Sequence, residues 1–185
     1  MIEALDIDAE RSLATDRLIL QPLGPEHARE LFPALQDAHL YRYIPVDPPL
    51  TVEALEAQYR AWAERKSADG SELWLNYVVR FRQTGRAVAT VQATVKDEGE
   101  AFIAYQTFSE HLGRGYAREA CRALTEYLAR PDISVQALVD TRNLASQRLL
   151  EAIGFDRVEK IDGADHFKGQ VSDEYRYVFR PPPPA

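Results

Sequence analysis

The sequence predicts an α/β sandwich, in which helices flank a central sheet of mixed but mostly antiparallel strands. Two observations carry this prediction. In the middle of the chain, three β-rich runs follow one another and are joined by short turns, which is typical of antiparallel strands. Closer to the C-terminus, a helical segment separates two further β-rich runs, as in a strand–helix–strand crossover.

The first half of the chain contains two predicted helices and four predicted strands. A strand is expected at residues 17–22 and a helix at 25–35, because proline is favoured in the first turn of a helix. Thr51 can cap a second helical region that ends near residue 65. Strands are then expected at 73–80, 87–96 and 100–108, with turns at 83–86 and 97–99.

The second half alternates helices and strands. A helix follows Gly115, and its apolar face is formed by residues that recur every four positions, namely Tyr116, Ala120, Leu124 and Leu128. The remaining elements are a strand at 133–139, a helix at 143–153, and strands at 155–161 and 174–179.

The composition is that of one globular domain without disulfides. At 185 residues, the chain is long enough to bury a sizeable core. Its only cysteine, Cys121, lies mid-helix among apolar neighbours and is expected to be a small buried hydrophobe. No metal site is expected, because the histidines are scattered without the spacing of metal ligands: His27, His39, His111 and His166.

Charge and hydropathy limit the partners. The net charge of −7 argues against nucleic acid, whose phosphates need a basic partner, but an acidic surface can steer a cationic amine. No apolar run approaches the length of a membrane span, and the acidic N-terminus does not resemble a signal peptide. We therefore expect a cytoplasmic protein, either a monomer or a homodimer. Residues 1–12 are predicted to form a loosely ordered acidic leader, residues 13–180 one domain, and residues 181–185 a proline-rich tail.

The segment 105–120 carries the most informative motif. A β-rich run ends there, Gly113 and Gly115 follow two residues apart, and a helix begins at once. The first amides of a helix have no intrahelical acceptor, so they can bind a phosphate, and glycines let it approach the backbone. The ATP-binding pattern G-x-x-x-x-G-K-[ST] is absent, and Arg118 breaks the dinucleotide pattern G-x-G-x-x-G/A. The segment is either a phosphate site of another kind or an ordinary loop.

A second segment, residues 139–155, begins a helix at Asn143 and ends it at Gly154, before a new strand from Phe155. Together with the glycine motif and the opening TDRLIL at residues 15–20, this segment resembles the GCN5-related N-acetyltransferase (GNAT) superfamily, in particular its RimJ/RimL-like branch. The resemblance covers residues 13–179. It implies an acetyl-CoA-dependent N-acetyltransferase in which the fourth and fifth strands splay apart.

The resemblance also assigns residues to acetyl-CoA. The pantetheine arm would lie against the backbone of Tyr105, Gln106, Thr107 and Phe108, and the pyrophosphate on the amides of Leu112, Gly113, Arg114, Gly115, Tyr116 and Ala117. Asn143 would cap its helix, bond the pantetheine, or both. Arg114 is either a phosphate contact or a solvated charge. Glu110 departs from the family, which often has Gln or Arg there, and its carboxylate would weaken pyrophosphate binding unless it points away.

The implied reaction is direct attack of an amine on the thioester within a ternary complex. Ser146 would donate a hydrogen bond to the leaving thiolate, or else be an ordinary helix serine. No general base stands out among the candidates Tyr105, Glu110, Asp140 and His166. Tyr41 and Tyr43 are expected to line the acceptor pocket, and the acceptor is either a protein N-terminus or a small-molecule amine.

Two other functions remain open at this point. A catalytically silent acyl-CoA-binding sensor or scaffold is compatible with the missing base and with Glu110. An ATP-binding α/β domain is compatible with the glycines, although no lysine follows them.

Overall fold

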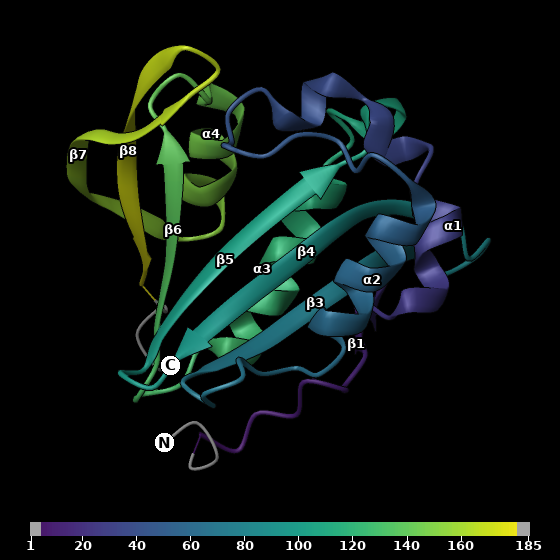
Figure 1. Cartoon of the computed structure of the whole chain (residues 1–185). Coiled ribbons are helices and arrows are strands. Elements are labelled where there is room, and N and C mark those ends of the chain that lie inside the picture. The colour runs from purple at the N-terminus through teal and green to yellow at the C-terminus, as the bar shows by residue number, and fades with distance from the viewer. Residues whose placement is uncertain (1–4, 181–185) are drawn as a thin grey trace.

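A computed structural model describes residues 5–180, in which eight strands form one sheet (Figure 1). The strands are β1 (Leu13–Ala14), β2 (Leu18–Pro22), β3 (Glu72–Phe81), β4 (Ala87–Lys96), β5 (Glu100–Thr107), β6 (Ser134–Asp140), β7 (Phe155–Phe167) and β8 (Gln170–Phe179). Their spatial order is β1-β2-β3-β4-β5-β6-β8-β7, and β5 and β6 are the one parallel pair among these strands. The predicted mixed, mostly antiparallel sheet is confirmed.

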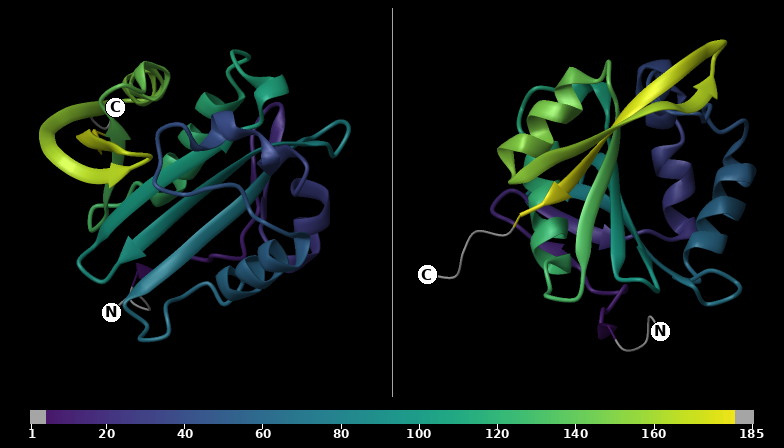
Figure 2. Two further views of the ribbon diagram at one scale, coloured as in Figure 1. Left: turned by 45° about the horizontal axis from the view of Figure 1, so that its top comes forward. Right: turned by 90° about the vertical axis from the view of Figure 1, so that its left-hand side faces the viewer.

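Helices cover both faces of this sheet (Figure 2). α3 (Tyr116–Leu128) packs on one face, where Leu124, Leu128 and Cys121 are buried in the larger core cluster. α1 (Ala28–Leu31) and α2 (Val52–Trp62) cover the other face and enclose a smaller cluster with Val78. α4 (Leu144–Ala152) contacts β7. Within residues 5–180, no helix is both long and apolar enough to cross a membrane.

The parallel pair of β5 and β6 is joined only at its start. The register runs from Glu100 opposite Ser134 to Phe102 opposite Gln136. Beyond Phe102, β5 continues against β4 alone, and β6 continues against β8 alone. The two strands therefore splay apart as the resemblance implied, and one edge of β5 is left without a neighbouring strand.

The first predicted helix is broken into three short pieces. The 3-10 turns Pro25–His27 and Ala34–Gln36 lie on either side of α1. Pro33 has no N–H to continue the helix, which explains why α1 ends where it does. The second predicted helix is confirmed, since the Thr51 hydroxyl accepts a 3.1 Å hydrogen bond from the amide of Ala54 at the start of α2.

The last two strands are much longer than the sequence predicts. Residues 161 and 174 are the predicted end of one strand and start of the next, whereas the observed ladder continues to Phe167 and Gln170. The tip of this hairpin is Lys168-Gly169, and both residues have positive φ angles. The added residues are mostly exposed, so no alternating apolar pattern marks them in the sequence.

Residues 5–12 contact the rest of the domain through hydrogen bonds and one buried side chain. The Tyr127 hydroxyl on α3 accepts from the amide of Asp8 at 3.0 Å and donates to its carbonyl at 2.9 Å. Arg130 donates to the carbonyls of Leu5 and Asp6, and Ala9 is buried in the core. Residues 1–4 and the proline-rich tail at 181–185 lie outside the described residues.

The burial of α3 predicts the cost of truncating its core face. Leu124, which is 1% exposed, contributes to the larger cluster, so Leu124→Ala should lower the free energy of unfolding by about 2–5 kcal/mol. The matched control is Leu50→Ala at a side chain that is 92% exposed, where a change within about 0.5 kcal/mol is expected. Urea denaturation followed by circular dichroism measures both, and equal losses would contradict this packing.

Candidate functional site

A groove of about 750 Å³ lies where β5 and β6 diverge. The end of β5, the glycine loop, the first turns of α3 and α4, and the segment 39–44 surround it. The groove brings together most of the residues predicted to bind the cofactor or to act in catalysis, namely Tyr105, Gln106, Thr107, Leu112, Gly113, Arg114, Gly115, Tyr116, Ala117, Asn143 and Ser146, and it also contains Tyr43, which was predicted for the acceptor pocket.

The glycine loop presents unsatisfied backbone amides to this groove. Gly113 and Gly115 have φ angles of 73° and 78°, which side-chain-bearing residues rarely adopt. Gly115 is the N-cap of α3 and has no side-chain cap. Among the described residues, none accepts a hydrogen bond from the amides of residues 113–118, and the amide of Glu119 is the first to bond back, to Gly115. The arrangement suits a phosphate group.

An ion pair between Arg17 and Glu119 connects the first turn of α3, next to the glycine loop, to the residue just before β2. The Glu119 carboxylate on α3 accepts from the Arg17 guanidinium at 2.6 Å and from the Arg17 amide and the Thr15 hydroxyl. The same guanidinium lies 4.7 Å from the centre of the Tyr116 ring and donates to the carbonyl of Arg114 at 3.3 Å. Thr15 and Arg17 belong to the TDRLIL motif at residues 15–20, but the sequence did not predict that they bind Glu119.

Three arginines line the groove with no charged partner among the described residues: Arg114, Arg118 and Arg148. They are exposed and can supply positive charge to phosphates, although the chain as a whole is acidic. Glu110 does not line the groove. Its carboxylate pairs with Arg86 at 2.6 Å in the preceding hairpin turn, which explains how the chain accommodates an acidic residue here.

Phe108 does not join the groove, unlike its predicted neighbours. Its ring is 3% exposed in the smaller core cluster, and its amide donates to the carbonyl of Val88 in a 3.0 Å bond. Because backbone hydrogen bonds alternate along antiparallel strands, the backbone of Gln106 also points toward β4. The backbone groups of Tyr105 and Thr107 therefore face the open edge.

Tyr105 and Ser146 meet across the groove. Their hydroxyl oxygens are 2.5 Å apart, and either can be the donor. Asn143 caps α4 by accepting from the Ser146 amide at 3.2 Å, which fixes the first turn that carries Ser146. Burial raises the pKa of Tyr105, so its hydroxyl stays protonated at neutral pH and serves as a hydrogen-bond donor.

The other three base candidates lie away from the groove. The Asp140 carboxylate is bonded by Arg142 and by Ser172. Burial raises the pKa of Asp140, but these bonds outweigh it and lower the pKa to about 2. His166 is exposed on the hairpin of β7 and β8, and Glu110 pairs with Arg86. Of the four candidates, the structure brings only Tyr105 to the groove.

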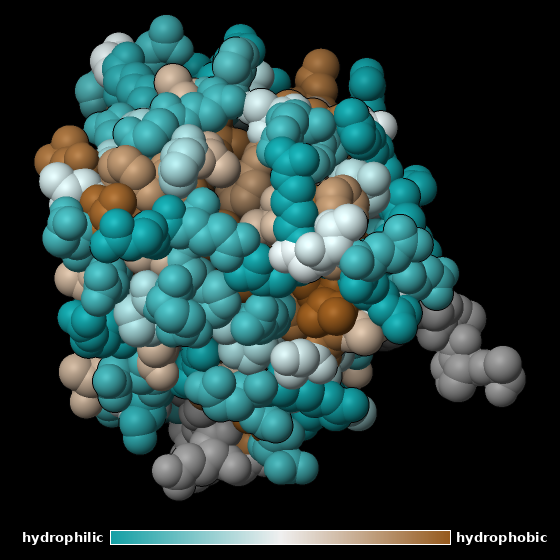
Figure 3. Space-filling view, turned by 90° about the vertical axis from the view of Figure 1, so that its right-hand side faces the viewer, coloured by the Kyte–Doolittle hydropathy of each residue, from teal (hydrophilic) through white to brown (hydrophobic). Residues whose placement is uncertain are grey.

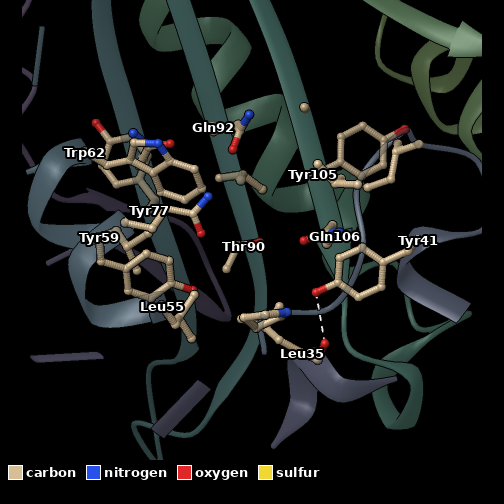
Figure 4. Close-up of a pocket in the computed structure, with 18 of the residues that line it drawn as sticks. Leu35, Tyr41, Leu55, Tyr59, Trp62, Tyr77, Thr90, Gln92, Tyr105 and Gln106 are labelled. Atoms are coloured by element: carbon tan, nitrogen blue, oxygen red, sulfur yellow. Dashed lines mark hydrogen bonds between the residues drawn. The ribbon is translucent and has the colours of Figure 1, made fainter. Parts of the chain in front are cut away.

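A second cavity of about 570 Å³ adjoins the first (Figure 4). Its walls come from α2 and residues 35–49, and its floor from β3, β4 and β5. Tyr105, Gln106 and Ile44 line both cavities. Tyr41 lines the second cavity, where its hydroxyl donates to the Leu35 carbonyl at 2.9 Å. Tyr43 lines the first instead, so the two tyrosines predicted for one pocket are divided between two.

The tip of the β7–β8 hairpin holds the wall shared by the two cavities. The Lys168 ammonium donates to the carbonyl of Tyr41 and, at 3.4 Å, to that of Ile44.

From the side of α1 and α2, the surface is mostly hydrophilic, with hydrophobic side chains gathered in small patches (Figure 3).

A family model described as the acetyltransferase (GNAT) domain matches residues 17–156. The chain belongs to the GNAT family. The predicted resemblance is thus confirmed, and this GNAT protein is an N-acetyltransferase. Within residues 5–180, no group of three or more His, Cys, Asp or Glu side chains could hold a metal ion.

Known relatives and structures agree with this family. The chain is 26% identical over 153 residues to an uncharacterized N-acetyltransferase of Bacillus subtilis, YoaA, and the match covers 78% of this chain and 82% of YoaA. RimL, a ribosomal-protein α-N-acetyltransferase solved with coenzyme A, has a TM-score of 0.78 at 18% identity over 91% of this chain and 97% of RimL. A spermidine N-acetyltransferase from Vibrio cholerae has a TM-score of 0.75 at 19% identity over 89% and 96% of the two chains. Both structural matches reflect the shared fold.

The anchor between Arg17 and Glu119 yields a pH-dependent prediction. Burial raises the pKa of Glu119, but the bonds from Thr15 and Arg17 outweigh it and hold the pKa below its usual 4.5. Glu119→Gln should therefore cost about 1–2 kcal/mol of unfolding free energy at pH 7. The deficit should persist down to about pH 4.5 and shrink as the pH falls through the lowered pKa, where the native carboxylate is also lost.

Urea titrations at pH 7 and pH 3 measure this deficit. The control is Glu56→Gln, which removes an exposed ion pair with Arg60 on α2 and should change stability by less than about 0.5 kcal/mol. A Glu119→Gln deficit that is as large at pH 3 as at pH 7 would show that the charge is not what stabilises the anchor.

Proposed function

We propose that this GNAT protein transfers the acetyl group of acetyl-CoA to a primary amine by direct attack within a ternary complex. The observation that carries the proposal is the pair of hydroxyls at the junction of the two cavities. Tyr105 lines both cavities, and its oxygen lies 2.5 Å from that of Ser146. A thioester held in the groove and an amine held in the second cavity would meet beside this pair.

The groove fits acetyl-CoA at two points. The orphan amides of residues 113–118 and the arginines beside them suit a pyrophosphate. The unpaired backbone of Tyr105 and Thr107 suits the amides of a pantetheine arm, because an unsatisfied edge can bind an extended chain as an extra strand. The family's use of acetyl-CoA supports the same assignment.

The reaction needs a neutral amine. Deprotonating a lysine amine, with a pKa of about 10.4, costs roughly 4–5 kcal/mol at pH 7, whereas an α-amine near 7.8 costs only about 1 kcal/mol. A weakly basic amine can thus lose its proton to water, which fits a site where Tyr105, the one predicted base candidate of the four that lines the groove, stays protonated.

The amine nitrogen bonds to the thioester carbon, the carbon–sulfur bond breaks, and the nitrogen gives its extra proton to water. The departing thiolate accepts a proton from Ser146. Tyr105 passes its own proton to Ser146 through the bond that joins the two hydroxyls, and water returns a proton to Tyr105. A protein N-terminus and a small-molecule amine both fit this reaction.

A cytoplasmic location, and a monomeric or homodimeric state, stay predictions.

The glycine loop allows a matched test of acetyl-CoA binding. Gly113 and Gly85 have φ angles of 73° and 71°, and an added Cβ would meet nothing within 4 Å at either. Alanine should therefore strain both backbones alike, by about 1–2 kcal/mol. Only Gly113→Ala places a methyl group in the groove, so it alone should weaken acetyl-CoA binding, by about tenfold or more.

Calorimetric titration with acetyl-CoA measures both glycine variants, with ATP as the control ligand. Equal affinity of Gly113→Ala and Gly85→Ala, or tighter binding of ATP than of acetyl-CoA, would contradict the assignment of the loop.

The hydroxyl pair predicts the effect of removing the acid. Ser146→Ala should lower kcat by about 10- to 100-fold, the low end of general acid catalysis, because a thiolate is already a fair leaving group. The affinity for acetyl-CoA should stay unchanged. Tyr105→Phe, which keeps the ring, should lower kcat less. Thiol release with a dye measures turnover, and wild-type protein that binds acetyl-CoA without releasing thiol would favour the silent sensor or scaffold.

A further inference from the structure

We infer that the acceptor is a monoamine with an apolar or aromatic body and no second charge. This inference rests on the proposed function and narrows the acceptor class. It comes from the second cavity, whose volume of about 570 Å³ is within the range of small-molecule sites.

The lining of the second cavity carries a single charged group within residues 5–180. Asp47 is the one carboxylate that lines the second cavity among the described residues, and no Lys, Arg or His lines it. A free amino acid would bring its carboxylate to a cavity without a cation. A polyamine would bring two or three ammonium groups to a single carboxylate. Unpaired charges that leave water for a protein cavity are strongly disfavoured, so both classes should bind poorly.

Aromatic and aliphatic side chains form the walls of the second cavity. The rings of Tyr59 and Trp62 on α2 stack with their centres 5.6 Å apart. Tyr41 and Leu35 face them across the cavity, with Leu55 below Tyr59 (Figure 4). Burial raises the pKa of Tyr59, so its ring carries no charge. Such a wall favours an apolar or aromatic body over a polar chain.

A row of uncharged polar side chains forms the floor of the cavity. Asn76 and Gln92 are directly opposite each other on β3 and β4, and Thr90 is opposite Gln106 on β5. Carboxamide and hydroxyl groups donate and accept hydrogen bonds without a charge, so the floor suits an acceptor with an uncharged donor or acceptor of hydrogen bonds, such as a carboxamide.

The experiment measures thiol release from acetyl-CoA with three amines, and each rate is divided by the fraction of that amine that is neutral at the assay pH. Phenylalaninamide has an aromatic body and a carboxamide, phenylalanine has a carboxylate in place of the carboxamide, and spermidine has additional ammonium groups and no aromatic body. The corrected kcat/KM should be about tenfold or more higher for phenylalaninamide than for the other two, because each of them brings an unpaired charge to the cavity. A higher kcat/KM for spermidine or phenylalanine would overturn the inference and leave the transferase intact.

Failure of the proposed function gives a different result. If wild-type protein releases no thiol with any of the three amines, with glycinamide or with a peptide that has a free N-terminus, the proposed transfer is wrong, and the acceptor inference falls with it.

Charge placed on the floor should redirect the choice of amine. Gln92 is exposed within the cavity, so both Gln92→Lys and Gln92→Glu can be accommodated. Gln92→Lys should raise the ratio of kcat/KM for phenylalanine to kcat/KM for phenylalaninamide about tenfold. Gln92→Glu should raise the ratio of kcat/KM for spermidine to kcat/KM for phenylalaninamide by a similar factor. Gln83→Lys and Gln83→Glu, on the exposed hairpin turn, should change neither ratio.

Unchanged ratios in both Gln92 variants, with melting temperatures near wild type, would overturn the inference. They would show that the acceptor does not contact this floor.

Discussion

The divergence of β5 and β6 after Phe102 is the constraint on which the site depends. Strands in one sheet normally satisfy each other's backbone groups, and here the two part after three paired positions. A groove forms along the open edge that results, and both the glycine loop and Ser146 line it. The site thus follows from an interruption in the sheet rather than from an added loop or domain.

The two cavities differ in the chemical groups that line them, and Tyr105 lines both. The groove presents backbone amides and arginines, which suit phosphates and amides of a cofactor. The second cavity presents rings, aliphatic side chains and carboxamides. β5 therefore supplies residues to both cavities.

The residue patterns predicted the sheet, and the two glycines before a helix predicted a phosphate site, because such motifs act locally. The splay of the strands and most of the groove residues were implied by the resemblance to the GNAT superfamily. The sequence did not predict that Phe108 turns into the core, since only the pairing with Val88 determines that direction. The bond between Arg17 and Glu119 joins residues 102 positions apart, and no local pattern encodes such a partner. The long hairpin was missed for another reason, because its exposed residues carry no apolar alternation.

The contact of Lys168 with the carbonyls of Tyr41 and Ile44 joins segments that are about 125 residues apart in the chain. During synthesis on the ribosome, the wall at residues 41–44 emerges about 125 residues before the side chain that holds it. This contact therefore forms only after Lys168 has been synthesised, when the residues of β1 to β7 are already present.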